Sequence, residues 1–329
     1  MNRTRTMTAS ADFLLAGRKI KIVSHVEPDG DALGSALGLA WILDAAGIEA
    51  RVHLPAPLPR LYSFLPGAKF LVVGEAPEDS FDRVAVVDCT SPARLGPIAA
   101  TALTGSLVLN VDHHADNTRF GDVVQVDPAA AATAILIADI AHDAQMRIGP
   151  EAAECLYTGI LTDTGRFTFG NTDERALRSA AQLVRAGANA AKIASLVYEN
   201  RPVSTLRLLG KALETLDLRE DGSVACLHVT HEMIAETGAL AEETEGFAAY
   251  ARSVQGVQVG IFLRETEEGS IKASFRSTGG VPVDGIASQF AGGGHPTAAG
   301  ARVPGPLETA KERILRAVGE HLQAQARST

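Results

Sequence analysis

Three short apolar runs in the first half of the chain each end in an acidic or imidazole side chain, and this arrangement constrains the fold most. The runs and the residues that follow them are 18–24 with His25, 83–87 with Asp88, and 106–111 with Asp112-His113-His114. The runs 83–87 and 106–111 are rich in Val or Leu, and 18–24 contains Ile20, Ile22 and Val23, so each is predicted to form a short strand. If the strands are parallel, the polar residues meet at one edge, where open α/β sheets bind ligands.

Helical patterns lie between and after these strands. They cover residues 32–46, 129–142 and 151–162. Gly47 follows the first pattern, while Pro128 and Pro150 stand at the start of the other two, and such Gly and Pro positions are ordinary helix end signals. Alternating strands and helices predict an α/β domain whose mainly parallel sheet is covered by helices.

The pattern changes beyond residue 187. Helical patterns over 189–197 and 203–216 flank a break at Asn200-Arg201-Pro202, and no Gly/Ser run separates them. We therefore expect a helical connector over 188–217, with a hinge near 199–202, rather than a flexible linker. A chain of 329 residues is also long enough for two domains of roughly 150 residues each. The first domain is predicted over 1–187.

The last part of the chain, 218–329, has hairpin character. Residues 223–230 follow the turn signal Asp221-Gly222, and residues 257–263 face residues 270–276 across the turn at 267–269. A final helix from 307 to about 324 would cover one face. We expect a smaller α/β domain with a mixed sheet.

Charge and cysteine content limit the environment and partners of the chain. The net charge is −9 and the pI is about 5.5, which argues against binding long duplex nucleic acid but leaves short anionic substrates possible. Three widely spaced cysteines indicate neither a disulfide framework nor a zinc ribbon. The N-terminus does not resemble a secretory signal, and the longest apolar stretch, 129–137, is short of the ~20 residues that span a membrane. We expect a soluble, cytoplasmic protein with no membrane partner.

Two further strings supply carboxylates in addition to those at the strand ends. They are His25-Val-Glu-Pro-Asp29-Gly-Asp31 and Leu161-Thr-Asp163-Thr-Gly165. Singly, such residues are often turn or capping residues. Together, imidazoles and carboxylates without thiolates suit two divalent cations, which lie roughly 3.5–4 Å apart when they activate water for phosphoester hydrolysis. The combination indicates a metallohydrolase in which one carboxylate bridges the metals.

These motifs resemble those of the DHH/DHHA1 phosphoesterase family. The resemblance runs from about residue 18 to residue 303 and includes Gly292-Gly-Gly-His295-Pro-Thr-Ala-Ala-Gly300 near the C-terminus. Asp88-Cys-Thr-Ser-Pro-Ala-Arg94-Leu, Asp112-His-His-Ala-Asp-Asn117 and Tyr157-Thr-Gly-Ile-Leu-Thr-Asp163-Thr-Gly-Arg-Phe167 are similar to the two-domain branch of NrnA-type oligoribonucleases and 3′-phosphoadenosine 5′-phosphate phosphatases. That branch also includes cyclic-dinucleotide phosphodiesterases.

The resemblance implies two ligand sets for two Mn²⁺ ions, with Mg²⁺ or Co²⁺ as alternatives. The first set would be His25, Asp29 and Asp88, and the second Asp31, Asp88, His113 and Asp163, so that Asp88 bridges. Asp88, Asp112 and His114 would be catalytic residues, and His114 would contact the scissile phosphate. Asp112 either orients a ligand imidazole, as metal-bound histidines usually require, or caps a turn.

The C-terminal motif implies substrate recognition. Consecutive glycines at Gly292, Gly293 and Gly294 free backbone N–H groups to meet an anion, and His295 and Arg276 can add charge-assisted hydrogen bonds to a phosphate. Ala291 departs from the family pattern, in which a further Gly often stands there. An added methyl matters little unless φ at this position is positive.

The function implied is hydrolysis of short 5′-phosphorylated single-stranded oligonucleotides, such as nanoRNA, pApA or pGpG, to mononucleotides, with 3′-phosphoadenosine 5′-phosphate phosphatase activity. A cyclic-di-AMP phosphodiesterase and a dedicated bisphosphate phosphatase are alternatives. A RecJ-like exonuclease, a manganese pyrophosphatase and a catalytically silent nucleotide-binding regulator fit less well. Family resemblance alone favours a homodimer.

Overall fold

A computed structural model describes residues 2–74, 81–99, 103–278 and 280–328. The chain divides into two compact units, Met1–Glu199 and Asn200–Thr329. Helix α7 (Ala190–Tyr198) belongs to the first unit and α8 (Val203–Glu214) to the second. The separate connector over 188–217 stays a prediction.

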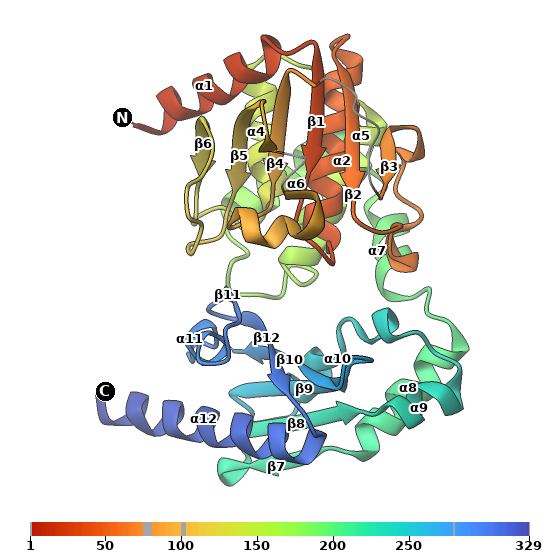
Figure 1. The fold of residues 1–329 in the computed structure, drawn as a ribbon, viewed down its shortest axis with the longest axis vertical. Coiled ribbons are helices and arrows are strands. Elements are labelled where there is room, and N and C mark those ends of the chain that lie inside the picture. Colours follow the sequence, from red (N-terminus) through yellow and green to blue (C-terminus); the bar gives the residue numbers. More distant parts are fainter. Residues whose placement is uncertain (1, 75–80, 100–102, 279, 329) are drawn as a thin grey trace. The chain divides into compact units, whose positions relative to one another are not determined.

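The first unit is built on a six-stranded parallel sheet of order β3-β2-β1-β4-β5-β6 (Figure 1). The strands are β1 (Lys19–Val23), β2 (Glu49–Leu54), β3 (Leu71–Val73), β4 (Arg83–Val87), β5 (Leu107–Asp112) and β6 (Val123–Val126). The strand order reverses between β1 and β4, and α/β sheets of this kind bind ligands beyond the carboxyl ends at such a reversal. The three strands predicted from sequence are confirmed.

Helices cover this sheet, with most of the core on one face. They are α1 (Asn2–Leu15), α2 (Gly30–Ala45), α4 (Thr133–Asp143), α5 (Pro150–Asp163), α6 (Glu174–Ala186) and α7. Apolar strand residues such as Ile22, Val52 and Leu109 pack in one cluster with residues of α2, α4 and α5. A smaller cluster on the other face joins Val23, Val84 and Val86 to the 3₁₀ segment Pro92–Ile98.

One helix boundary predicted from sequence is wrong. The expected helix over 129–142 begins only at Thr133, four residues later than Pro128 and Ala129 suggested. Ala132, at the N-cap, is extended and offers no side-chain hydrogen bond. The helix begins instead where a carboxylate from another helix meets its first N–H groups, as described below.

The second unit contains a six-stranded mixed sheet of order β11-β12-β10-β9-β8-β7 (Figure 1). The strands are β7 (Asp217–Arg219), β8 (Val224–Val229), β9 (Val259–Glu265), β10 (Ser270–Ser277), β11 (Gly293–His295) and β12 (Ala298–Pro304). Neighbours are antiparallel except β8 and β9, which are parallel. The predicted mixed sheet and the β9–β10 hairpin are confirmed.

The two faces of this sheet have separate apolar cores. The helices are α8, α9 (His231–Thr237), α10 (Phe247–Arg252), α11 (Asp284–Ser288) and α12 (Leu307–Ser328). Residues of α11 and α12 pack with Ile271, Ala273 and Phe275 of β10. Residues of α8 and α10 pack on the other face with β8 and with Phe262 of β9. Burial alternates along β10, as expected of an antiparallel strand with one core face.

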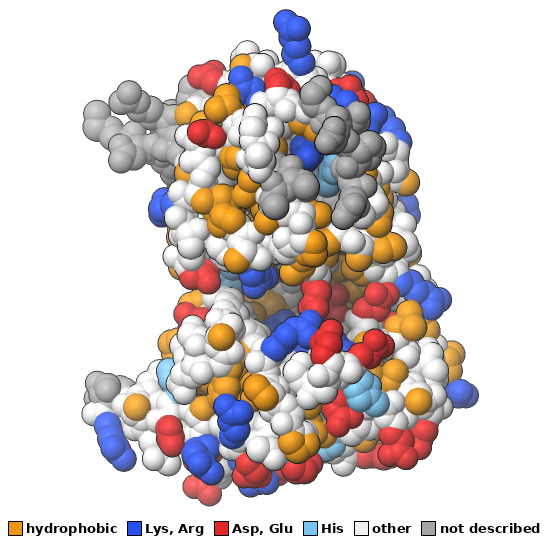
Figure 2. Space-filling model, viewed as in Figure 1, with side chains coloured by type: hydrophobic (Ala, Val, Ile, Leu, Met, Phe, Trp, Pro, Cys, Tyr) orange, Lys and Arg blue, Asp and Glu red, His pale blue; other side chains and the backbone are white. Residues whose placement is uncertain are grey.

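Two surface properties bear on the partners of the chain. In the part of the chain that the structure describes, no helix is long and apolar enough to cross a membrane. On the face of the second unit that Figure 2 shows, acidic and basic side chains are interspersed rather than gathered by sign.

Candidate metal centre

The central strands of the first unit deliver polar side chains at their carboxyl ends. His25 lies two residues after the end of β1, Asp88 directly follows β4, Asp112 ends β5 and His113 follows it. These strands are neighbours in the sheet, so the three ends meet where the strand order reverses. The sequence prediction that they share one edge is confirmed.

Asp88 stands at the middle of this edge and is 2 % exposed. Its Oδ2 lies 3.6 Å from Nε2 of His25, while its Oδ1 lies 3.7 Å from Nε2 of His113. The backbone at Asp88 is left-handed, with φ of 54°, a conformation that Asp adopts more readily than most residues. The two oxygens of one carboxylate therefore face two different imidazoles.

His25, Asp29 and Asp88 form the first group that could hold a metal, with ligand atoms within 4.8 Å of one another. Asp29 caps α2, because its Oδ1 accepts hydrogen bonds from the N–H groups of Asp31 at 3.1 Å and Ala32 at 3.0 Å. This cap fixes the carboxylate at the start of the helix. It also places Asp31 in the first turn of α2, at the same edge of the sheet.

Asp31, His113 and Asp163 form the second group. Nε2 of His113 lies 3.1 Å from Oδ2 of Asp163 and 3.8 Å from Oδ2 of Asp31. Asp163 ends α5, and Gly159 on the same helix leaves room for Asp31, because a Cβ there would lie 2.5 Å from Oδ1 of Asp31. The close packing of α2 on α5 thus allows the two carboxylates to approach one imidazole.

The orientation of both histidines fits metal binding. Nδ1 of His25 lies 2.8 Å from the carbonyl oxygen of Val26, and Nδ1 of His113 lies 3.1 Å from that of Ala130. A carbonyl only accepts, so each Nδ1 carries the proton and, in the neutral ring, each Nε2 presents its lone pair. These lone pairs face carboxylate oxygens of Asp88, Asp31 and Asp163. The distances to Asp88 and Asp31 are 3.6–3.8 Å, longer than a hydrogen bond, and only Asp163 is closer, at 3.1 Å from His113. A cation between them would satisfy both partners.

The close spacing of carboxylates and imidazoles shifts the pKa values of these groups. Burial alone lowers the pKa of His25, but the carboxylates of Asp88 and Asp29 more than reverse this and raise it to about 9. The pKa of His113 is likewise raised, despite burial, by Asp163, Asp88 and Asp31. Burial and the neighbouring carboxylates raise the pKa of Asp31, whereas the surrounding imidazoles hold the pKa of Asp88 below its usual value. Without a metal, protons on histidine supply the positive charge that this site requires.

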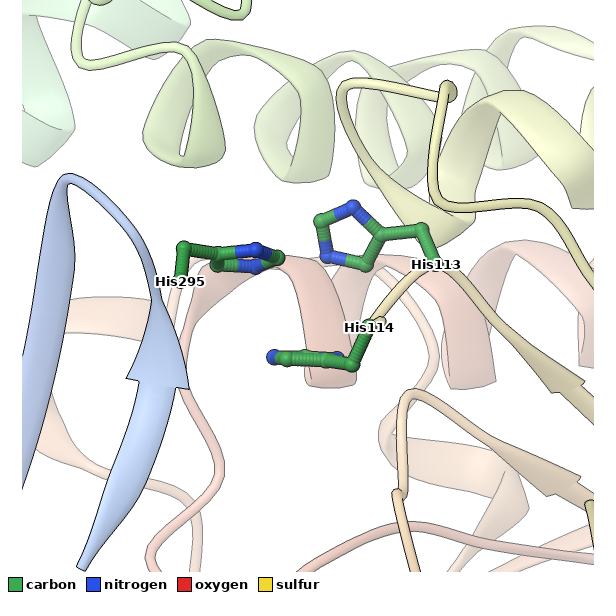
Figure 3. A group of neighbouring side chains, drawn as sticks. All are labelled: His113, His114 and His295. Carbon is green, nitrogen blue, oxygen red and sulfur yellow. The ribbon is translucent and has the colours of Figure 1, made fainter. Parts of the chain in front are cut away.

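Asp112 serves a different imidazole from the one expected. Its Oδ1 accepts a hydrogen bond from Nδ1 of His114 at 2.8 Å and from the backbone N–H of His113 at 2.8 Å, so it orients His114 and also caps the turn. Figure 3 shows the rings of His113 and His114 side by side after β5, with centroids 4.7 Å apart. Asn117 donates to Oδ2 of Asp112 at 2.6 Å. His114 is thus held rigidly next to Asp88, whose Oδ1 is 3.8 Å away.

Two residues that contact the centre were not identified from sequence as site residues. Asn117 was part of a quoted motif, but its bond to Asp112 had no separate signal. Thr133 donates its hydroxyl to Oδ1 of Asp88 at 2.9 Å. It lies inside an apolar stretch of alanines, so nothing local marked it.

In the second unit, the structure places Arg276 and His295 in one row of the sheet. Arg276 on β10 pairs with Ala298 on β12, which in turn pairs with His295 at the end of β11. Directly paired residues point to the same face of a sheet. Two basic side chains therefore flank the small Ala298, an arrangement suited to an anion.

The glycine run lies mostly in a strand, and its role in substrate binding stays a prediction. Gly293 and Gly294 lie in β11 and pair with Gly300 and Ala299, so they do not form an open loop. A Cβ on Gly292 would meet the carbonyl oxygen of Gly300, and one on Gly294 would meet that of Ala298. The glycines permit close strand packing. Ala291 has a positive φ of 55°. Alanine is less favourable than glycine in this left-handed conformation, so its methyl group does matter here.

Comparisons with known proteins agree with this architecture. The N-terminal domain of the DHH family matches residues 19–160, and the DHHA1 domain matches residues 222–324. The bifunctional oligoribonuclease and PAP phosphatase NrnA of Thermus thermophilus is 39% identical over 92% of this chain and 90% of its own length. The protein of the same name from Bacillus subtilis is 29% identical over 85% of this chain and 87% of its own length.

A solved structure is similar over the whole chain. An exopolyphosphatase-related protein from Bacteroides fragilis superposes with a TM-score of 0.88 and 28% identity, covering 98% of each chain. The similarity therefore includes both units and the segment that joins them.

Proposed function

The chain belongs to the DHH family of metal-dependent hydrolases and carries a DHHA1 domain, and from this premise we propose that it hydrolyses short 5′-phosphorylated oligonucleotides to mononucleotides. We further propose that the same centre removes the 3′-phosphate of 3′-phosphoadenosine 5′-phosphate. The names of the relatives from Thermus and Bacillus, which combine an oligoribonuclease with a PAP phosphatase, support both parts of the proposal.

The observation that carries this proposal is the position of Asp88 between two groups of ligands. One oxygen faces the group with His25 and Asp29, and the other faces His113 of the group with Asp31 and Asp163. We assign these residues as the ligands of two metal ions, with Asp88 as the bridge. Two ions in such a site activate a water for attack and neutralise the phosphoryl oxygens.

We assign Mn²⁺ as the metal from the chemistry of the donors. The six side chains offer imidazole nitrogen and carboxylate oxygen, a mixture that Mn²⁺ accepts and that soft metals do not require. The nearby Cys89 is buried and donates its thiol to the carbonyl of Ser91. Burial raises the pKa of this thiol to about 12, so it supplies no thiolate.

The remaining residues of the first unit orient the substrate. Asp112 holds Nδ1 of His114, so that Nε2 is the atom available to a ligand, and we propose that it donates to an oxygen of the scissile phosphate. Burial alone lowers the pKa of His114, but Asp112 and Asp88 raise it above its usual value. A protonated imidazole is the form that best binds a phosphate.

The second unit would bind another part of the substrate. We propose that Arg276 and His295 contact its terminal phosphate, with Ala298 between them leaving space. The backbone at Gly292, Gly293 and Gly294 would border this phosphate as part of the sheet edge. Recognition of an end would restrict the enzyme to short single-stranded substrates rather than long duplexes.

Cellular setting and assembly complete the proposal. We infer a cytoplasmic enzyme from the free, buried cysteines Cys89, Cys155 and Cys226, because such thiols are typical of reducing compartments. We also infer a homodimer, on family resemblance.

The test is Mn²⁺-dependent turnover on a substrate panel. The panel contains pApA, a five-nucleotide RNA, a 24-nucleotide RNA, cyclic di-AMP, 3′-phosphoadenosine 5′-phosphate and pyrophosphate. The proposal expects fastest hydrolysis of pApA and the short RNA, with slower release of phosphate from the bisphosphate. Faster hydrolysis of cyclic di-AMP, the bisphosphate or pyrophosphate would show that the proposed main substrate is wrong. Absence of turnover on every compound in the panel would contradict the proposed activity.

A further inference from the structure

Thr133, the first residue of α4, contacts carboxylates from both ligand groups. Its backbone N–H donates to Oδ2 of Asp31 at 2.5 Å, and its hydroxyl donates to Oδ1 of Asp88 at 2.9 Å. Thr133 is fully buried, so water does not compete for either bond. One residue therefore links the proposed bridge to a ligand of the second group.

The contact with Asp31 takes the place of an ordinary helix cap. The first N–H groups of a helix have no partner within it, and the N-cap residue Ala132 has no side chain to supply one. Asp31 accepts both the N–H of Thr133 and that of Ala134, the latter at 3.0 Å from Oδ1. Because each oxygen is held by one N–H, the Asp31 carboxylate is fixed in direction. The positive end of the α4 dipole also favours its charged form.

The contact with Asp88 selects between two oxygens. The hydroxyl of Thr133 binds Oδ1, the oxygen that faces His113, and leaves Oδ2 to face His25. A carboxylate can rotate about its Cβ–Cγ bond, and Asp88 would lose its bridging orientation if it did. The Thr133 hydroxyl opposes that rotation from the side of the second ligand group.

We propose that Thr133 is a positioning residue that sets the carboxylate of Asp88 for the metal held by Asp31, His113 and Asp163. The inference rests on the two-metal centre proposed above. It concerns the side-chain hydroxyl alone, because the N–H bond to Asp31 does not depend on the side chain. Loss of a hydrogen bond that orients a ligand typically weakens metal affinity by roughly 10–100-fold.

The experiment compares Thr133→Val, which keeps the shape but removes the hydroxyl, with Thr133→Ser, which keeps the hydroxyl. Thr205→Val is the matched control, because Thr205 is 1 % exposed and donates its hydroxyl to Glu243 at 2.9 Å in the second unit. Mn²⁺ is titrated calorimetrically into each metal-free protein, and pApA hydrolysis is measured at limiting and at excess Mn²⁺. Thermal unfolding of the metal-free proteins shows whether each variant folds, and Thr133→Ala replaces Thr133→Val if the valine does not fit.

The proposal expects two Mn²⁺ sites in the wild type and selective weakening of one of them, by roughly 10-fold or more, in Thr133→Val. Excess Mn²⁺ should restore most of the turnover of this variant. Thr133→Ser and Thr205→Val should keep both affinities. Two unchanged Mn²⁺ affinities in Thr133→Val would overturn the inference and leave the proposed function standing. If the wild type binds no Mn²⁺ and has no turnover, both the inference about Thr133 and the proposed function are wrong.

Discussion

The two sheets of this protein display their polar residues in different ways. In the first unit, Val84–Val87 of β4 are buried, and the polar residues lie beyond the strand ends. In the second unit, β10 alternates, with Ile271, Ala273 and Phe275 buried and Arg276 on the opposite, partly exposed face. A parallel sheet covered on both sides can offer a ligand only its edge, whereas a mixed sheet can offer part of a face.

The difference extends to charge. The edge of the first unit gathers four carboxylates around two imidazoles, which favours cations. The row of Arg276 and His295 in the second unit is basic, which favours anions. If the first sheet holds the metals and the second contacts the terminal phosphate, as we propose, then variants of the two sheets should have separable effects.

The largest effect should come from Asp88→Asn. Asn tolerates the left-handed backbone at this position, so the unit should fold, but the shared charge of the bridge is lost. We expect turnover of pApA to fall by roughly 1,000-fold or more, with two-site Mn²⁺ binding lost. Asp143→Asn, an exposed residue at the end of α4, is the matched control and should behave as the wild type. Normal turnover and metal content in Asp88→Asn would contradict the bridging assignment.

A strong pH dependence should accompany metal binding to the first unit. The pKa of His25 is raised from 6.5 to about 9 in the metal-free fold, so its proton stabilises that fold below about pH 6.5 and this contribution disappears as the pH rises to 9. Mn²⁺ must displace the proton, and its apparent affinity should rise about 10-fold per pH unit over this range and then level off. Titrations at several pH values, with thermal unfolding of the metal-free protein, measure both trends. A flat affinity would show that His25 is not a ligand.

Variants of the basic row should affect the substrate and not the metal. We expect Arg276→Ala or His295→Ala to raise the KM for pApA by roughly 10-fold, because a charge-assisted hydrogen bond to phosphate is lost, while Mn²⁺ affinity stays unchanged. Arg316→Ala, an exposed residue of α12, is the control for Arg276. Steady-state kinetics at saturating Mn²⁺ provide the readout. An unchanged KM would show that Arg276 and His295 do not contribute to substrate binding.

The smallest effect should come from Ala291→Gly. Ala291 has a left-handed backbone, which is strained for alanine, and glycine would relieve the strain at some cost in chain entropy. We expect the free energy of unfolding to rise by less than about 1 kcal/mol in urea denaturation. Ala235→Gly, at an exposed position within α9, should instead lower it by about 1 kcal/mol. If both variants were destabilised equally, the backbone strain at Ala291 would be refuted.

Much of the first unit could be predicted because several of its candidate metal ligands stand at or just after the ends of strands. His25, Asp88 and Asp112 each come directly after a segment predicted to be a strand, so a local pattern indicates both the strand and the position of the side chain. The hairpin of β9 and β10 was predicted because the turn signal at 267–269 separates two strand-like segments. Strands such as β2 and β6 were not predicted, because Glu49, Arg51 and Gln125 interrupt their apolar pattern.

The rest depended on contacts between residues distant in sequence. Thr133 lies 102 residues from Asp31 and 45 from Asp88, and both bonds exist only after α4 packs beside α2. The same contact determines where α4 begins, which is why the sequence placed its start too early. The glycines near His295 looked like an open loop, but Gly293 and Gly294 pair with β12, which the local sequence did not indicate.

Electron paramagnetic resonance can establish whether Asp88 bridges two Mn²⁺ ions, as we propose. Two ions that share a carboxylate lie roughly 3.5–4 Å apart and are magnetically coupled. Wild-type protein loaded with two equivalents of Mn²⁺ should therefore give a coupled spectrum, and Asp88→Asn should not. Two independent six-line signals from the wild type, or an unchanged coupled spectrum from Asp88→Asn, would contradict the account.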